Sequence, residues 1–225
     1  MARSGGLRQA VSFVVGSTAI LIVDDAQAAR RPHVADHGRS SCLVLEWMDP
    51  HELVPAGERW MAKETTRILG EARIAARWDW SRDGERASSA PTREHRLRVV
   101  LLPSEPSGPG WGLGKNTLGT TLINGVSAPP AVYIFYRSVV SLLSRDGRSH
   151  SWSDPYAVGP ASRAFGRVVA HEVAHALAPA EPHARSGLMQ AGLAAALLTD
   201  RNDVAFDERW ERALSAGLSE LCSVR

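Results

Sequence analysis

The chain has 225 residues, of which 44% are hydrophobic and 22% are charged, and its formal net charge is +2 at pH 7. This composition suits one globular domain with its own hydrophobic core. Basic and acidic residues are interspersed along the chain, which argues against a surface for nucleic acid or for an anionic membrane.

The first residues have the pattern of a secretory signal peptide. Two arginines precede an apolar run at residues 10–23, and Ala26 and Ala28 supply small residues for cleavage. The run has about 14 residues, fewer than the ~20 that an N-terminal anchor helix needs to cross a bilayer. We therefore expect a secreted or periplasmic protein that keeps no membrane span after cleavage. The expected divisions are a signal peptide at 1–28, a flexible mature N-terminus at 29–41 and one domain at 42–225.

Alternating and helical apolar patterns follow one another along the rest of the chain. Compact apolar runs predict strands at residues 41–47, 75–80, 95–102, 118–125 and 131–136. Amphipathic or proline-bounded runs predict helices at residues 53–72, 137–143, 160–178, 190–198 and 206–218. A strand, a helix and then further strands indicate an α/β layer with crossover connections.

Cys42 and Cys222 lie near the two ends of the mature chain. Export to an oxidising compartment would permit a disulfide between them. The alternative is two separate thiols, and spacing alone does not decide between these possibilities.

The helix predicted between Pro160 and Pro179 contains the pattern H-E-x-x-H. His171 and His175 are four residues apart, so on a helix they stand on one face and can bind one zinc ion. Glu172 lies roughly 100° round the helix from His171, beside the position where the metal would hold a water molecule. The alternative is a pair of core histidines that are hydrogen-bonded to backbone carbonyls.

A catalytic zinc ion takes three protein ligands and a water, so a third ligand must follow the helix. Glu181 lies six residues beyond His175 and His183 lies eight residues beyond it. With this motif the chain resembles the zinc metallopeptidases of the zincin superfamily, and within them the metzincins. Their motif H-E-x-x-H-x-x-G-x-x-H is followed by a turn with a methionine beneath the metal.

The chain looks closest to small secreted bacterial proteins in which this motif is stretched. In that group the third histidine comes eight residues after the second, and Ser/Thr-Gly-Leu/Ile-Met follows. His183 and the SGLM run that ends at Met189 match this version. Glu181 occupies the metzincin position of the third histidine, so it stays open as the alternative ligand, and a neutral imidazole at His183 is preferred because it completes a His₃ site.

The resemblance implies a metzincin-like α/β (α+β) fold with a mixed twisted sheet, a long backing helix, an active-site helix and a C-terminal helix. It implies that His171, His175 and His183 bind Zn²⁺, that Glu172 is the general base and that Met189 is the methionine of the turn. We therefore expect a secreted zinc metallopeptidase that acts on a peptide or protein as a monomer. The alternative is a non-catalytic zinc-binding periplasmic or extracellular protein with a zincin fold.

Overall fold

The structure, a computed structural model, describes residues 42–54, 57–80, 94–107, 117–122, 130–145, 155–202 and 204–223. These residues belong to one compact unit, residues 37–225. The predicted signal peptide and the segment predicted to be flexible lie outside the described residues and stay predictions, as does the division into one domain. No helix within the described ranges has both the length and the apolar character that crossing a membrane requires.

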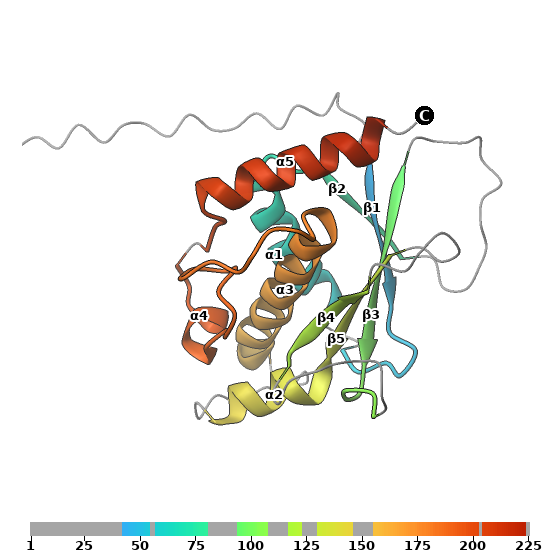
Figure 1. The fold of residues 1–225 in the computed structure, drawn as a ribbon. Helices are drawn as coiled ribbons and strands as arrows, with labels where there is room; N and C mark the ends of the chain where they lie inside the picture. The colour runs from blue at the N-terminus through green and yellow to red at the C-terminus, as the bar shows by residue number, and fades with distance from the viewer. Residues whose placement is uncertain are drawn as a thin grey trace, which may run out of the picture. The chain divides into compact units, whose positions relative to one another are not determined.

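Five strands form one sheet in the described part of the chain (Figure 1). They are β1 (Leu43–Met48), β2 (Ala76–Asp79), β3 (His95–Leu102), β4 (Gly119–Leu122) and β5 (Ala131–Phe135). The order is β2-β1-β3-β5-β4, and only the β4–β5 pairing is antiparallel. This mixed sheet confirms the α/β fold class, and it places β4 at the edge.

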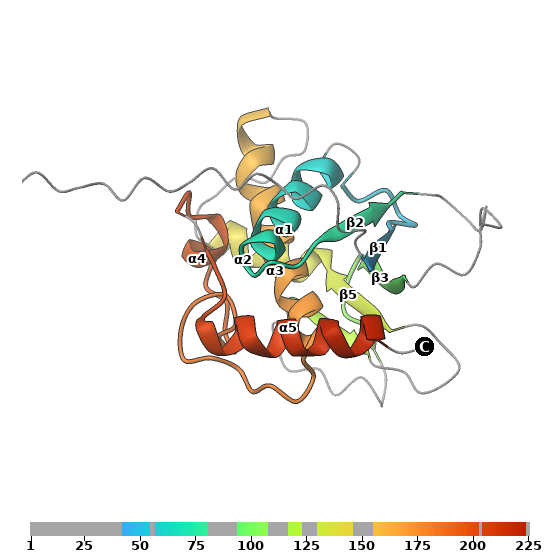
Figure 2. The same ribbon diagram turned by 90° about the horizontal axis from the view of Figure 1, so that it is seen from above.

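The helices of the described chain are α1 (Glu58–Glu71), α2 (Tyr136–Arg145), α3 (Pro155–Leu177), α4 (Ala195–Thr199) and α5 (Glu208–Ser223). Figures 1 and 2 show α1 and α3 side by side against one face of the sheet. Between them the Thr65 hydroxyl lies 3.0 Å from the carbonyl oxygen of Gly166. The predicted long backing helix and active-site helix are therefore neighbours in one layer.

Alternation along β3 shows which face of the sheet the described helices cover. Leu97, Val99 and Leu101 are fully buried, as a strand that turns every second side chain toward the helices requires. The intervening Arg96 and Arg98 instead pair with Glu46 of β1, at 2.7 and 3.5 Å. Charged pairs of this kind suit a sheet face that is open to water.

Several helix boundaries differ from those predicted. The helix predicted from residue 53 begins at Glu58, because a turn precedes it in which the Gly57 N–H donates to the Val54 carbonyl oxygen over 3.0 Å. The active-site helix begins at Pro155 and not at Pro160, because Pro155 occupies the first helical position, where proline is favoured. Pro160 lies inside the helix of 23 residues and removes one of its backbone hydrogen bonds. The helix predicted at 190–198 is confined to α4, since Gln190 pairs with Ala184 in a β-bridge. The C-terminal helix continues beyond residue 218 to Ser223.

A disulfide joins Cys42 to Cys222 across a sequence separation of 180 residues, with the two Cα atoms 6.0 Å apart. Cys42 directly precedes β1, and Cys222 lies in the last turn of α5. Of the two possibilities left open by the sequence, the structure has the bridge. It fastens the C-terminal helix to the start of β1.

Candidate metal centre

The last turns of α3 carry His171, Glu172 and His175 beside the sheet edge. His171 is 6% exposed and Glu172 is 7% exposed, while His175 is half-buried. The apolar residues between them, Val173 and Ala174, are completely buried. Because the helix packs through these apolar residues, its polar side chains are held at the boundary between the core and the cleft.

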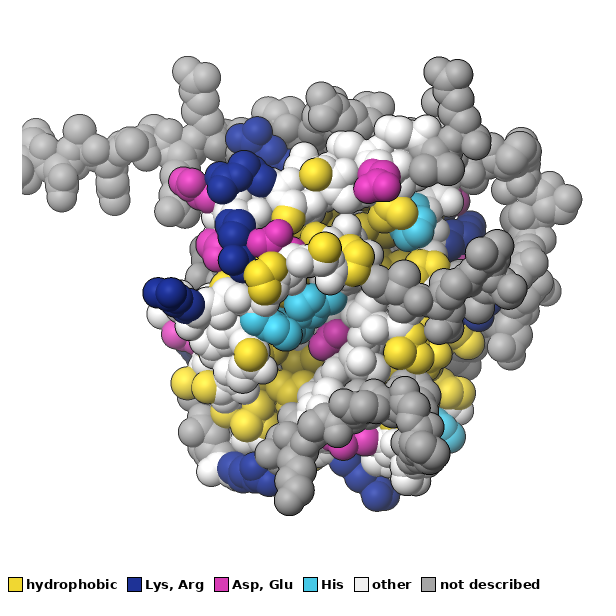
Figure 3. Space-filling view, in the orientation of Figure 1, with side chains coloured by type: hydrophobic (Ala, Val, Ile, Leu, Met, Phe, Trp, Pro, Cys, Tyr) yellow, Lys and Arg dark blue, Asp and Glu magenta, His cyan; other side chains and the backbone are white. Residues whose placement is uncertain are grey.

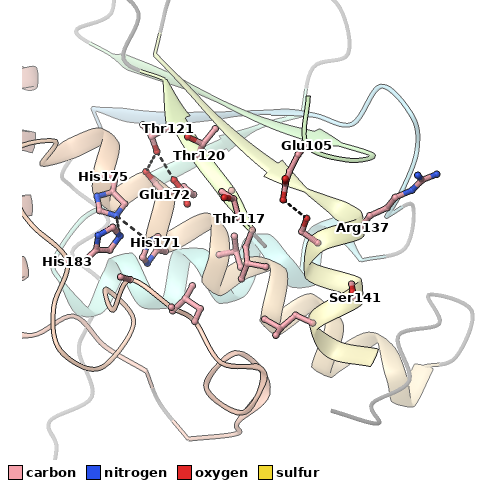
Figure 4. A pocket seen from close by; sticks show the side chains of 18 of the residues that line it. Glu105, Thr117, Thr120, Thr121, Arg137, Ser141, His171, Glu172, His175 and His183 are labelled. Atoms are coloured by element: carbon pink, nitrogen blue, oxygen red, sulfur yellow. Dashed lines mark hydrogen bonds between the residues drawn. The ribbon is translucent and has the colours of Figure 1, made fainter. Parts of the chain in front are cut away.

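His183 joins the two helical histidines after α3 has ended (Figure 4). The Nε2 atom of His175 lies 3.2 Å from Nε2 of His171 and 3.1 Å from Nε2 of His183. One ligand atom from each histidine lies within 4.8 Å of those of the others. Two nitrogens bound to one tetrahedral zinc ion at ~2.0–2.1 Å would be about 3.3 Å apart. The three imidazoles can therefore hold one metal ion between them.

The protonation state of His171 fits metal binding. Its Nδ1 lies 2.8 Å from the carbonyl oxygen of Leu188. Since a carbonyl only accepts, Nδ1 carries the proton and donates it, which leaves the Nε2 lone pair of the neutral ring for a metal. Burial lowers the pKa of His171 to about 4. Burial, together with His171 and His183, also lowers the pKa of His175 to about 4, so both rings are neutral at pH 7.

Glu181, the alternative third ligand, is engaged elsewhere. Its Oε1 atom lies 2.8 Å from Nε of Arg209, on α5. The candidate metal cluster among the described residues consists of the three histidines and does not include Glu181. Between the two third ligands that the sequence left open, the geometry favours His183.

Glu172 lies beside the histidines but points toward the edge strand (Figure 4). The Thr121 hydroxyl lies 3.0 Å from its Oε2 and 2.8 Å from its backbone carbonyl oxygen. Burial raises the pKa of Glu172 to about 7, against the lowering effect of the Thr121 hydrogen bond. A carboxylate with this pKa can accept a proton and release it again near neutral pH.

Gly119 of β4 also determines where Glu172 can lie. A Cβ atom at this position would be 2.8 Å from the Tyr133 carbonyl oxygen and 2.9 Å from Cγ of Glu172. The absence of a side chain therefore lets α3 approach the edge strand closely. Together, Gly119 and Thr121 hold the Glu172 carboxylate in one position.

Met189 is 2% exposed and belongs to the hydrophobic core. Its carbonyl oxygen accepts a hydrogen bond of 2.8 Å from the backbone N–H of Ala184, and Gln190 N–H donates to Gly187 over 3.3 Å. The turn that contains Met189 thus folds back onto the residue that follows His183. The adjacent carbonyl of Leu188 fixes the His171 ring, whereas the place of Met189 beneath a metal stays a prediction.

A cleft of about 900 Å³ opens in front of the histidines. In Figure 3 the histidines and an acidic side chain lie together in a hollow that continues over hydrophobic side chains. Its apolar lining residues are Leu118, Leu142, Val168, Ala191 and Leu193. The cleft also follows the threonines of β4 and reaches α2, where Ser138 donates to Glu105 over 3.0 Å.

Sequence reasoning missed the residues that orient the motif. Thr121 is 51 positions away from Glu172, and Arg209 is 27 positions away from Pro182. The Thr-rich character of the edge strand was visible in the sequence, but a strand pattern gives no register against a distant helix. These contacts depend on the tertiary packing of β4 and α5 around the end of α3.

No family model matches the sequence, and no curated protein matches it. Among solved structures, the chain is similar to the crystal structure of archaemetzincin from Methanopyrus kandleri. The TM-score is 0.48 with 15% sequence identity, over 80% of this chain and 98% of that chain.

Proposed function

We propose that this protein is a zinc-dependent metallopeptidase. The observation that carries the proposal is the convergence of three histidine nitrogens beside a buried glutamate in an open cleft. Neutral imidazoles in a set of three are typical ligands of a catalytic zinc, and they leave a coordination position for a water. The position of Glu172, next to these ligands and not among them, suits a general base.

A zinc ion bound by His171, His175 and His183 would polarise the carbonyl of a peptide bond and lower the pKa of a water molecule. Glu172 accepts the proton of the attacking water and passes it to the departing amine. The Thr121 hydroxyl stabilises the carboxylate before the proton arrives, and burial makes the carboxylate more basic. The Leu188 carbonyl keeps the His171 ring in the tautomer that the site needs.

The cleft supports an extended peptide as the substrate. β4 is hydrogen-bonded to β5 and forms the edge of the described sheet, and Thr117 to Thr121 line the cleft. A peptide strand can pair with the outer backbone groups of such an edge strand. The apolar side chains of Leu118, Val168 and Leu193 would then accept a hydrophobic side chain of the substrate.

We also propose that the protein works outside the cytoplasm, as a monomer that is exported by its N-terminal segment. The Cys42–Cys222 disulfide supports this location, because disulfides persist in oxidising compartments. The mass of the protein recovered from the periplasm or the medium tests it. Removal of residues 1–28 is the expected result, and recovery of the uncleaved chain from the cytoplasm alone would contradict it.

The proposal predicts that the variant Glu172→Gln keeps zinc but loses hydrolysis. A general base contributes about 10²–10⁴-fold to the rate, so kcat/KM on a peptide library should fall by this factor. Metal content is measured by mass spectrometry, and cleavage is measured with and without a chelator. The matched control is Glu105→Gln, which changes another carboxylate of the same cleft and should keep kcat.

The activity and zinc content of further variants distinguish this proposal from its alternatives. Full activity of Glu172→Gln would refute the mechanism, and bound zinc with no cleavage by the wild type would favour the non-catalytic zinc-binding alternative. His183→Ala should lose the metal, whereas Glu181→Gln should retain one equivalent. Loss of zinc from the Glu181 variant alone would show that the third ligand is wrong.

A further inference from the structure

The three histidines differ in what orients their rings. His171 donates from Nδ1 to the Leu188 carbonyl. His183 is exposed, and within the described chain its Nδ1 shows no hydrogen bond of this kind. Metal-binding histidines normally rely on such a second partner for their orientation. The orientation of the His183 ring must therefore come from the backbone that carries it.

That backbone is held by one side chain of α5. The guanidinium of Arg209 contacts Glu181 Oε1 through Nε at 2.8 Å. Its second contact is a hydrogen bond of 2.6 Å from Nη2 to the carbonyl oxygen of Pro182, the residue that directly precedes His183. Two contacts by one planar group on consecutive residues fix both the position and the rotation of this stretch.

The helix that presents Arg209 is itself firmly placed. Asp207 accepts a hydrogen bond of 2.8 Å from the backbone N–H of Trp210, which caps the first turn of α5. The fully buried Trp210 ring stands edge-on to the His175 ring, with centroids 5.4 Å apart. Farther along, Gly217 packs so closely on the end of α3 that a Cβ atom there would overlap the Leu177 carbonyl oxygen. Arg209 therefore projects from a fixed support.

We propose that Arg209 is a positioning residue that selects the third metal ligand. It holds the Glu181 carboxylate away from the helical histidines and turns His183 toward them. The inference rests on the proposed zinc site. When Arg209 is removed, Glu181 is released only two residues before His183, and its carboxylate competes for the metal.

The test compares Arg209→Ala with the wild type by zinc affinity and by the visible absorption spectrum of the Co²⁺-loaded protein. Zinc Kd, measured by chelator competition, should rise about 10-fold, at the lower end of the effect of losing an outer-shell partner. The Co²⁺ spectrum should change because a carboxylate replaces or displaces an imidazole. The double variant Arg209→Ala with Glu181→Gln should regain a spectrum close to that of the wild type, since the competing carboxylate is gone.

Arg212→Ala is the matched control, because Arg212 lies on the same helix and, among the described residues, pairs with the exposed Glu208 alone, at 3.7 Å. It should leave the zinc Kd and the Co²⁺ spectrum unchanged. An unchanged Kd and spectrum for a folded Arg209→Ala would overturn the inference while the wild type still binds zinc. If the wild type binds no zinc, the proposed function itself fails. Should Arg209→Ala not fold, Arg209→Lys decides, because lysine lacks the planar fork that makes both contacts; a raised Kd is expected, and an unchanged Kd overturns the proposal.

Discussion

Replacing Thr121 with valine should shift the pH dependence of hydrolysis to higher pH. Valine keeps the branched shape of the side chain and removes the hydroxyl that lies 3.0 Å from Oε2 of Glu172. A hydrogen bond to a carboxylate favours its charged form, so this bond lowers the pKa of Glu172. Its loss therefore raises that pKa, and the base remains protonated up to a higher pH.

The size of the shift follows from the geometry of the hydroxyl. A hydrogen bond to a charged group is worth about 1.5–3 kcal/mol, and one pKa unit corresponds to about 1.4 kcal/mol. The single proton of Thr121 is shared with the Glu172 carbonyl oxygen, which lies 2.8 Å away, so the lower end applies. We expect a shift of about one pKa unit, which is a tenfold loss of kcat/KM on the acid limb and little loss at high pH.

The assay is kcat/KM as a function of pH for the wild type, Thr121→Val and Thr120→Val. Thr120 lines the same cleft on the same strand and serves as the control. Burial raises the pKa of Glu172 to about 7 in the metal-free protein, and a bound cation lowers it in all three proteins, so the difference between acid limbs is the quantity to compare. Identical acid limbs for Thr121→Val and the wild type would refute this role of the hydroxyl.

Two further predictions concern the frame of the site. Reduction of the Cys42–Cys222 disulfide should lower the free energy of unfolding by about 2–5 kcal/mol, because the disulfide closes a long loop. Urea unfolding with and without reductant measures this loss, and the double Cys→Ser variant, as the control, should not respond to reductant. Equal unfolding midpoints for the oxidised and reduced protein would contradict the prediction. Gly119→Ala should cost about 1–3 kcal/mol through overpacking against the Tyr133 carbonyl and Glu172, and it should also lower kcat. Urea unfolding and peptide hydrolysis test this second change. A variant with unaltered stability and unaltered kcat would show that β4 shifts to accept the methyl group without loss of free energy.

Local patterns were sufficient for the elements that bury apolar residues at a regular period. The alternation in β3 and the periodicity of α1 predicted these elements because burial repeats every second residue in a strand and every 3.6 residues in a helix. Helix boundaries were less accurate at α1, α3 and α5, where the first or last turn does not follow from the apolar period. The α5 helix continues to the half-cystine that ties it to β1.

The candidate metal centre shows the same division between local and tertiary information. His171, Glu172 and His175 share two turns of one helix, so their spacing alone places them together. The choice between Glu181 and His183 has no such local rule, because both follow the helix at distances that the chain can span. In the proposed site the tertiary position of α5 would decide it, because Arg209 pairs with the Glu181 carboxylate and donates to the Pro182 carbonyl oxygen. The third ligand of the proposed site would therefore depend on both α3 and α5, whereas the motif on α3 specifies only the first two proposed ligands.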